Sequence, residues 1–194
     1  MINEQLKKFT ITLGSSSPRR KELLSNLGLK FSIQIPNKYE SYPINLKEHE
    51  IAVFLAKQKA KSLSGNLSKT DLLITADTIV SLKGELLNKP KSKEQAFNTL
   101  NKLSGNMHKV ITGVCIKSSK KEIAFSAITL VTFNRLTEKE INFYINTFNP
   151  FDKAGSYGIQ EWIGQIGISK IDGSYSNVVG LPTAELYQKL NDFI

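Results

Sequence analysis

The sequence predicts a mixed α/β fold, in which helices alternate with both crossover strands and hairpin strands. Apolar runs separated by helical patterns open the chain, paired strand patterns flank short turns in its middle, and a helical pattern closes it. Such an order is typical of a mixed central sheet with flanking helices. The 194 residues, 40% hydrophobic and 22% charged, suffice for a packed core, and we expect one domain over residues 1–194.

The first half of the chain begins with a predicted strand, helix and second strand. These are "FTITLG", "PRRKELLSNLG", which closes at Gly28, and "KFSIQIP". Residues 37–46 are expected to form a loop, and residues 47–63 a long helix that ends before Gly65. The strands "DLLITADTIV" and "ELLNKP" flank the turn "SLKG" and predict a hairpin.

The second half begins with a predicted helix from Lys93 to Leu103. A second and longer pair of strands follows, "KVITGVCIKS" and "EIAFSAITLVTFN", and then a helix opened by Thr137 as its N-cap. We expect residues 149–167 to be mostly irregular and residues 168–180 to form a final strand region. The last helix is "LPTAELYQKLNDF", with Pro182 near its start.

Composition favours a cytoplasmic protein. No run approaches the roughly 18 apolar residues of a membrane helix, and the polar N-terminal segment has no secretion signal. The lone Cys115 has no partner for an internal disulfide, which suits a reducing compartment.

The net charge of +9 raises the alternative of a basic nucleic-acid-binding protein, linked to cell division or DNA damage. The basic residues are scattered, however, and only Arg19, Arg20 and Arg135 are arginine. A lysine-rich solvated surface is therefore the favoured interpretation, and such a surface also suits a small polyanionic substrate.

The segment "GSSSPRRK" predicts an anion site. Ser17 and Pro18 make an ordinary helix start as N-cap and first helical residue. Arg19 and Arg20 then fill the first turn, where the helix dipole disfavours cations. A bound anion would make the arginines favourable at this position. Its phosphate oxygens would accept from the backbone N–H groups, the hydroxyls of Ser15 to Ser17 and the guanidiniums.

Two charged residues stand where apolar ones are expected. Asp77 lies in the apolar run "LLITADTIV" and shares a strand face with Thr75 and Ile79, so that a fully solvated side chain is the weaker interpretation. On a helical wheel Lys59 falls within the apolar arc, whereas Lys57 lies outside it. Lys59 is either a lysine at the edge of the core or a phosphate partner, and both alternatives stay open.

Other candidates carry a weaker signal. Glu40, Glu48 and Glu50 could ligate a metal or be solvated acids, and Lys89 and Lys153 are further candidates for phosphate contacts. The two histidines lack zinc-site spacing, and no catalytic triad or glycine-rich nucleotide-binding motif is present.

Seven motifs in order resemble the Maf family of nucleoside triphosphate pyrophosphatases. They are "SSSPRRKELL", "LAKQKAK", "ADTIV", "GELLNKP", "LSGNMHKVITGV", "DKAGSYGIQ" and "GSYSNVVGLP", and they span nearly the whole chain. The resemblance implies an elongated mixed α/β fold with a cleft between two lobes, similar to inosine triphosphate pyrophosphatases. It also implies hydrolysis of a nucleoside triphosphate to monophosphate and pyrophosphate with Mg²⁺ or Mn²⁺, and a possible homodimer.

The resemblance also implies residue roles. The strand acid of the family, its catalytic base, corresponds to Asp77, which with Glu40 would hold the metal. The substrate-binding positions correspond to Ser15, Ser17, Arg19, Arg20, Lys59, Thr78, Lys89, Lys153 and Gln160. Of these, Arg20, Thr78 and Gln160 are associated in the family with substrate choice.

Gln160 favours dTTP and UTP as substrates. Its amide offers a donor beside an acceptor, matching the carbonyl and N–H of a uracil or thymine edge. The family subgroup similar to 7-methyl-GTP pyrophosphatases usually has Glu here. The next residue is Glu161, where the family usually has Gly, so a carboxylate that reads 7-methyl-GTP is the alternative.

Overall fold

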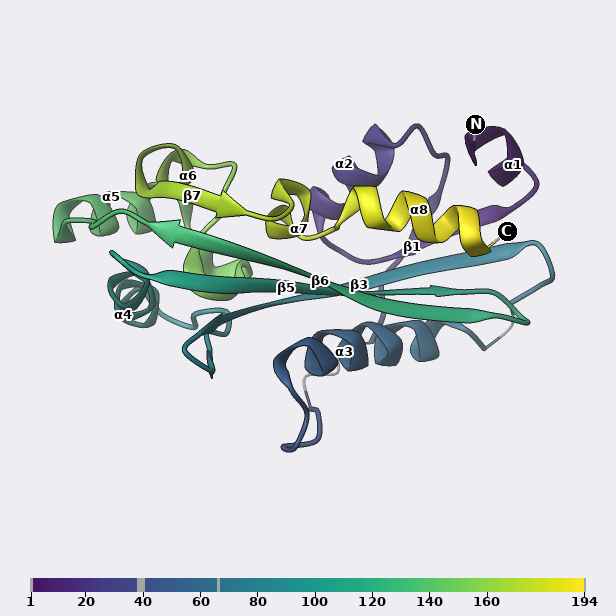
Figure 1. Ribbon diagram of the computed structural model, residues 1–194, viewed down its shortest axis with the longest axis horizontal. Helices are drawn as coiled ribbons and strands as arrows, with labels where there is room; N and C mark the ends of the chain where they lie inside the picture. Colours follow the sequence, from purple (N-terminus) through teal and green to yellow (C-terminus); the bar gives the residue numbers. More distant parts are fainter. Residues whose placement is uncertain (1, 38–40, 66, 194) are drawn as a thin grey trace. The chain divides into compact units, whose positions relative to one another are not determined.

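The computed structural model describes residues 2–37, 41–65 and 67–193. Its helices are α1 (Ile2–Leu6), α2 (Pro18–Asn26), α3 (Glu48–Leu63), α4 (Lys93–Leu103), α5 (Glu138–Phe148), α6 (Trp162–Gly167), α7 (Tyr175–Val179) and α8 (Thr183–Phe193), with 3₁₀ turns η1 (Pro150–Asp152) and η2 (Ala154–Ser156) (Figure 1). Its strands are β1 (Thr10–Gly14), β2 (Ser32–Gln34), β3 (Asp71–Leu82), β4 (Glu85–Leu86), β5 (Met107–Lys117), β6 (Glu122–Phe133) and β7 (Ile168–Asp172). The expected mixed α/β class is confirmed.

The strands of the described residues form one sheet in the order β2-β1-β3-β5-β6-β7, with β4 paired to β3. β1 is parallel to both β2 and β3, because the helices α2 and α3 supply the crossovers between them. β3 and β4 are antiparallel, with Ser81 opposite Leu86, as the predicted hairpin requires. Its turn places Lys83 and Gly84 at positive φ, the backbone of a tight hairpin turn.

The chain divides into two compact units. The first comprises Met1–Asp77, Thr112–Ala127 and Gly180–Ile194, and the second comprises Thr78–Ile111 and Ile128–Val179. Asp77 and Thr78, neighbours on β3, therefore belong to different units. The single domain expected over residues 1–194 stays a prediction.

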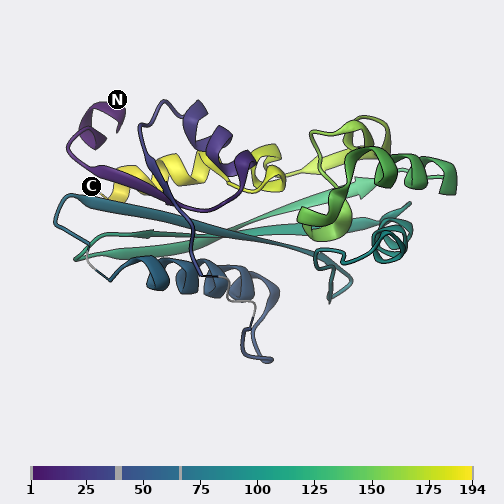
Figure 2. The same ribbon diagram turned by 180° about the vertical axis from the view of Figure 1, so that it is seen from behind.

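In the first unit helices cover both faces of the strands. α3 lies on one face and α2 and α8 lie on the other, as both views show (Figures 1 and 2). The α8 side holds a cluster of buried side chains built around Leu13, Ile74 and Leu186. On the α3 side the contact is made by small residues, because Ala52, Ala56 and Ala60 are fully buried.

The approach of α3 to the strands is unusually close. A Cβ atom at Gly113 of β5 would lie 2.2 Å from the backbone carbonyl of Ala52, so only glycine fits at this crossing. Beside it the Thr75 hydroxyl donates a hydrogen bond of 2.7 Å to the Ala56 carbonyl. The backbone of α3 is thereby held directly against the sheet. This close contact fixes the positions that the α3 side chains can reach.

The second unit has its own core. α4 packs against α5 and η2, and buried side chains such as Leu100, Val131 and Ile141 fill the space between helices and strands. α5 begins as predicted: the Thr137 hydroxyl accepts from the Glu140 N–H, and the Glu140 carboxylate accepts from the Thr137 N–H.

The structure differs from the sequence predictions at four places. Residues Tyr175–Val179 form a helix, α7, where a strand region was expected, and the stretch expected to be irregular contains α6. The N-terminal helix α1 was not predicted. β2 covers Ser32–Gln34, which is shorter than the run that predicted it.

His108 predicts a pH dependence of stability. Its ring is 2% exposed, and Nε2 lies 2.8 Å from the Tyr157 hydroxyl. Burial lowers the pKa of His108 from 6.5 to about 4. Between these values the unfolded chain binds a proton that the folded chain excludes, so the free energy of unfolding should fall as pH falls from about 6.5 to about 4.

The expected loss between pH 7 and pH 5 is about 2 kcal/mol, at roughly 1.4 kcal/mol for each pH unit below 6.5. Urea unfolding of the wild type at pH 7 and pH 5 measures it, and His108→Gln is the control in which this component of the pH dependence should disappear. An equal pH dependence in both proteins would contradict the assignment.

Candidate active site

The end of β1 and the first turn of α2 bring three of the predicted residues together. The Ser17 N–H donates to Ser15 Oγ at 3.2 Å, and Ser17 Oγ caps α2 by accepting from the Arg20 N–H at 3.4 Å. Arg20 Nη1 donates a hydrogen bond to Ser15 Oγ at 3.4 Å. Part of the expected anion-binding potential is thus used inside the turn, and the hydroxyls hold the Arg20 side chain in place.

The Arg20 guanidinium is further fixed by the start of the C-terminal segment. Arg20 Nε donates to the Gly180 carbonyl at 2.8 Å, and Gly180 has a φ of +131° that disfavours other residues. Burial lowers the pKa of Arg20, the Asp77 carboxylate opposes this by raising it, and the Arg19 guanidinium adds to the lowering. Arginine stays protonated under such conditions, so the turn presents a partly desolvated positive charge that the Asp77 carboxylate influences.

Asp77 and Lys59 form an ion pair across α3 and β3. Lys59 Nζ donates to Asp77 Oδ1 and, at 3.2 Å, to the carbonyl of Ala76. Their side chains are 18% and 20% exposed, whereas the Lys57 side chain is 52% exposed, as the helical wheel predicted. Lys59 is thus directed from the edge of the core at the strand acid, and its role as a phosphate partner stays a prediction.

In the second unit Lys153 lies within a network of charged and hydroxyl groups. Its side chain is only 8% exposed, and Nζ lies 2.8 Å from Asp152 Oδ1 and 3.0 Å from Glu161 Oε1. The Tyr144 hydroxyl donates to Glu161 Oε2 and accepts from the Gly158 N–H at 3.0 Å. Burial, and then the hydrogen bond to Glu161, raise the pKa of Tyr144, so its hydroxyl stays protonated.

The remaining predicted residues have less defined surroundings. Thr78 of β3 is half-buried, and the side chains of Lys89 and Gln160 are exposed. Glu40 lies outside the described residues. The described residues contain no group of three or more His, Cys, Asp or Glu side chains placed to hold a metal ion.

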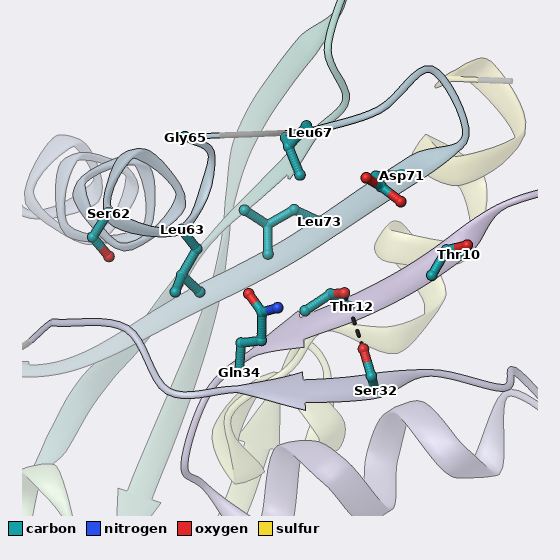
Figure 3. Close-up of a pocket in the computed structure, with 10 residues that line it drawn as sticks. All are labelled: Thr10, Thr12, Ser32, Gln34, Ser62, Leu63, Gly65, Leu67, Asp71 and Leu73. Carbon is teal, nitrogen blue, oxygen red and sulfur yellow. Dashed lines mark hydrogen bonds between the residues drawn. The ribbon is translucent and has the colours of Figure 1, made fainter.

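A polar hollow of the first unit is lined by none of these residues. It has a volume of about 520 Å³ and opens on the sheet beside the end of α3, lined by Thr10, Thr12, Ser32, Gln34, Ser62, Leu63, Gly65, Leu67, Asp71 and Leu73 (Figure 3). Thr12 and Ser32 are hydrogen-bonded across it at 3.0 Å. These ten lining residues include a carboxylate and no cation, so the hollow does not suit a triphosphate.

Sequence reasoning missed Gly180 and Tyr144 as partners of site residues. Arg20 and Gly180 are separated by 160 positions, and Tyr144 precedes Glu161 by 17. The signal for Gly180 was the motif "GSYSNVVGLP", which was recognised without a role. Tyr144 carried no signal, because its position in the apolar stripe of α5 explains it without a hydroxyl partner.

The sequence matches a known protein family. The family model of Maf-like proteins matches residues 10–193, and the chain belongs to this family.

Curated relatives align over almost their full length. A dTTP/UTP pyrophosphatase of Phocaeicola vulgatus is 50% identical over 188 residues, covering 96% of this chain and 97% of the relative. One of Porphyromonas gingivalis is 48% identical over 193 residues, covering 98% and 97%. One of Flavobacterium psychrophilum is 48% identical over 187 residues, covering 96% of each chain.

Proposed function

We propose that this chain is a nucleoside triphosphate pyrophosphatase that hydrolyses dTTP and UTP to the monophosphate and pyrophosphate. The observation that carries the proposal is the Lys59–Asp77 pair, an acid and an ammonium group on facing elements, with the Arg20 guanidinium under the influence of the same acid. The name shared by the three relatives, dTTP/UTP pyrophosphatase, supports the substrate class.

In the proposed reaction water attacks the α-phosphorus and the bond from that phosphorus to the bridging oxygen breaks. Asp77 accepts the proton of the attacking water, and pyrophosphate leaves with the bonding electrons. Lys59, Lys89 and the arginines Arg19 and Arg20 offset the growing charge on the phosphate oxygens. The hydroxyls of Ser15 and Ser17 hold the arginine turn and contact phosphate.

The described residues fit a divalent cation that arrives with the nucleotide. Asp77 supplies one carboxylate, and Mg²⁺ is commonly held by one or two carboxylates together with substrate phosphates. Glu40 is proposed as the second ligand. When bound, Mg²⁺ or Mn²⁺ supplies charge neutralisation at the phosphate oxygens and acidifies the attacking water.

Base selection is assigned to Gln160, with Thr78 and Arg20 contributing. The alternative reader, Glu161, is disfavoured because Lys153 contacts one of its carboxylate oxygens and Tyr144 the other. A carboxylate held this way has less capacity to accept from the N–H groups of guanine. This arrangement supports dTTP and UTP over 7-methyl-GTP.

A pyrophosphate-release screen tests the function. We expect dTTP and UTP to exceed CTP, GTP, ATP, ITP and 7-methyl-GTP by about tenfold or more in kcat/KM, with Mg²⁺ or Mn²⁺ present, since mismatched polar groups cost at least ~1–3 kcal/mol. Preference for 7-methyl-GTP would overturn the base assignment. Salt-sensitive binding to duplex DNA without hydrolysis would overturn the proposal as a whole.

We also propose that the chain forms a homodimer, on the basis of the family resemblance. Light scattering of the purified chain tests this oligomeric state.

The proposed location of the protein is the cytoplasm. None of the helices in the described part of the chain has the length and apolar character that a membrane crossing needs. Cytoplasmic residence is proposed from the buried free thiol of Cys115, which suits a reducing compartment.

A further inference from the structure

The turn that carries Gln160 is held by the partly buried Glu161 carboxylate, which contacts the buried side chains of Tyr144 and Lys153. Glu161 occupies the N-cap position of α6, yet its side chain makes no capping hydrogen bond. The carboxylate instead turns back over the preceding residues: a Cβ atom at Gly158 would lie 2.7 Å from Glu161 Cδ. Glycine at 158 therefore makes the space into which the Glu161 carboxylate folds.

The Glu161 carboxylate is bound at both oxygens. Oε1 lies 3.0 Å from Lys153 Nζ, and Oε2 accepts from the Tyr144 hydroxyl, which in turn accepts from the Gly158 N–H at 3.0 Å. The Glu161 N–H closes the turn on the Gly158 carbonyl at 3.0 Å. The turn is thus fixed to α5 through Tyr144 and to the η1–η2 segment through Lys153.

Within this turn the side chains alternate between interior and solvent. Ile159 is 5% exposed and packs in the core of the second unit, whereas the Gln160 side chain is exposed. With Ile159 buried on one side and the Glu161 carboxylate held on the other, the backbone of Gln160 has little freedom. The amide is therefore presented from a rigid support, which reduces the entropy lost on binding.

We propose that Glu161, Tyr144 and Lys153 are positioning residues for base selection, which fix the turn 158–161 so that Gln160 meets the base edge in one orientation. This rests on the proposed function of the chain. Lys153 then acts through Glu161 and not by gripping phosphate, because two carboxylates, those of Asp152 and Glu161, face its ammonium group.

Glu161→Gln tests the proposal, since it keeps the shape of the side chain and removes the charge that holds Lys153. We expect KM for dTTP to rise about tenfold with kcat within about twofold, and the kcat/KM ratio of dTTP over CTP to fall about tenfold, as for a lost binding interaction. Glu85→Gln is the matched control: Glu85 pairs with Lys102 at 2.7 Å with both side chains exposed, and its kinetics should stay unchanged.

A double-mutant cycle with Gln160→Ala distinguishes a positioning role of Glu161 from a general destabilisation of the fold. In the Gln160→Ala background Glu161→Gln should change the dTTP to CTP ratio no further, because the group that it positions is gone. Tyr144→Phe, which leaves the ion pair and removes the hydroxyl, should lower the same ratio in the wild-type background only.

Three outcomes would overturn the inference: an unchanged ratio in Glu161→Gln, an equal fall in kcat for all substrates, or an effect that persists in full without Gln160. Failure of the proposed function has a different signature, because the wild type itself would then release no pyrophosphate from dTTP or UTP. The wild-type rates in the same assay therefore decide which of the two has failed.

Discussion

Asp77→Asn is expected to lower kcat for dTTP hydrolysis by about 10²–10⁴-fold, the range for loss of a general base. The amide has nearly the shape of the carboxylate and still accepts from Lys59, so the strand should keep its place. The variant loses the carboxylate that we propose as the acceptor of the proton from water. Initial rates of pyrophosphate release at saturating dTTP and metal measure the effect, and circular dichroism confirms that the fold is kept.

Asp71→Asn is the matched control on the same strand. The Asp71 carboxylate accepts a hydrogen bond of 2.7 Å from the Ser68 N–H and lines the polar hollow of Figure 3. Since Asp71 is the first residue of β3, six positions before Asp77, kcat should stay within about twofold of the wild type. Near-normal turnover in Asp77→Asn would remove Asp77 from the role of base.

Lys59→Met is expected to lower kcat/KM for dTTP by about 10²–10³-fold, comparable to removing one electrostatic contact in a partly desolvated site. The methionine keeps most of the apolar stem but leaves Asp77 without its ammonium partner and the triphosphate without one cation. A steady-state comparison over a range of dTTP concentrations separates the effect on binding from that on turnover.

Lys57→Met removes a lysine two positions earlier on the same helix. Lys57 pairs with Glu122 at 3.0 Å, and its side chain is 52% exposed. Lys57→Met therefore removes the same charge as Lys59→Met, but from an exposed position away from Asp77. Its kcat/KM should change by less than about twofold, as expected for an exposed pair. If the two variants lost activity equally, general charge and not the position of Lys59 would be responsible.

Local patterns predicted most elements of the fold. The helix from Lys93 to Leu103 and the capped start at Thr137 agree with the structure, because their signals lie within a few residues. The segment Tyr175–Val179 was misassigned, since its aromatic and β-branched residues favour strands. There Asn177 is fully buried and its amide donates to the Val110 carbonyl and the Thr129 hydroxyl, partners that the local sequence does not show.

The candidate site was predictable where a residue broke a local rule. Lys59 in an apolar arc and Asp77 in an apolar strand were visible as exceptions, and the structure pairs them. The supports were not visible: the Gly180 carbonyl that fixes Arg20 is 160 positions away, and the hydroxyl of Tyr144 lies in a stripe that packing alone explains. Such contacts arise from tertiary packing and leave no period in the sequence.

The close crossing of α3 over β5 has a consequence for how variants of this protein would be interpreted. Ala52, Ala56 and Gly113 touch no proposed substrate group, yet they set the height of α3 above the strands and hence the reach of Lys59 to Asp77. A larger side chain at any of them would lift the lysine from its acid. In a mutational scan, substitutions of these small residues would lower activity as strongly as substitutions of catalytic residues, although the small residues only set the spacing between helix and sheet.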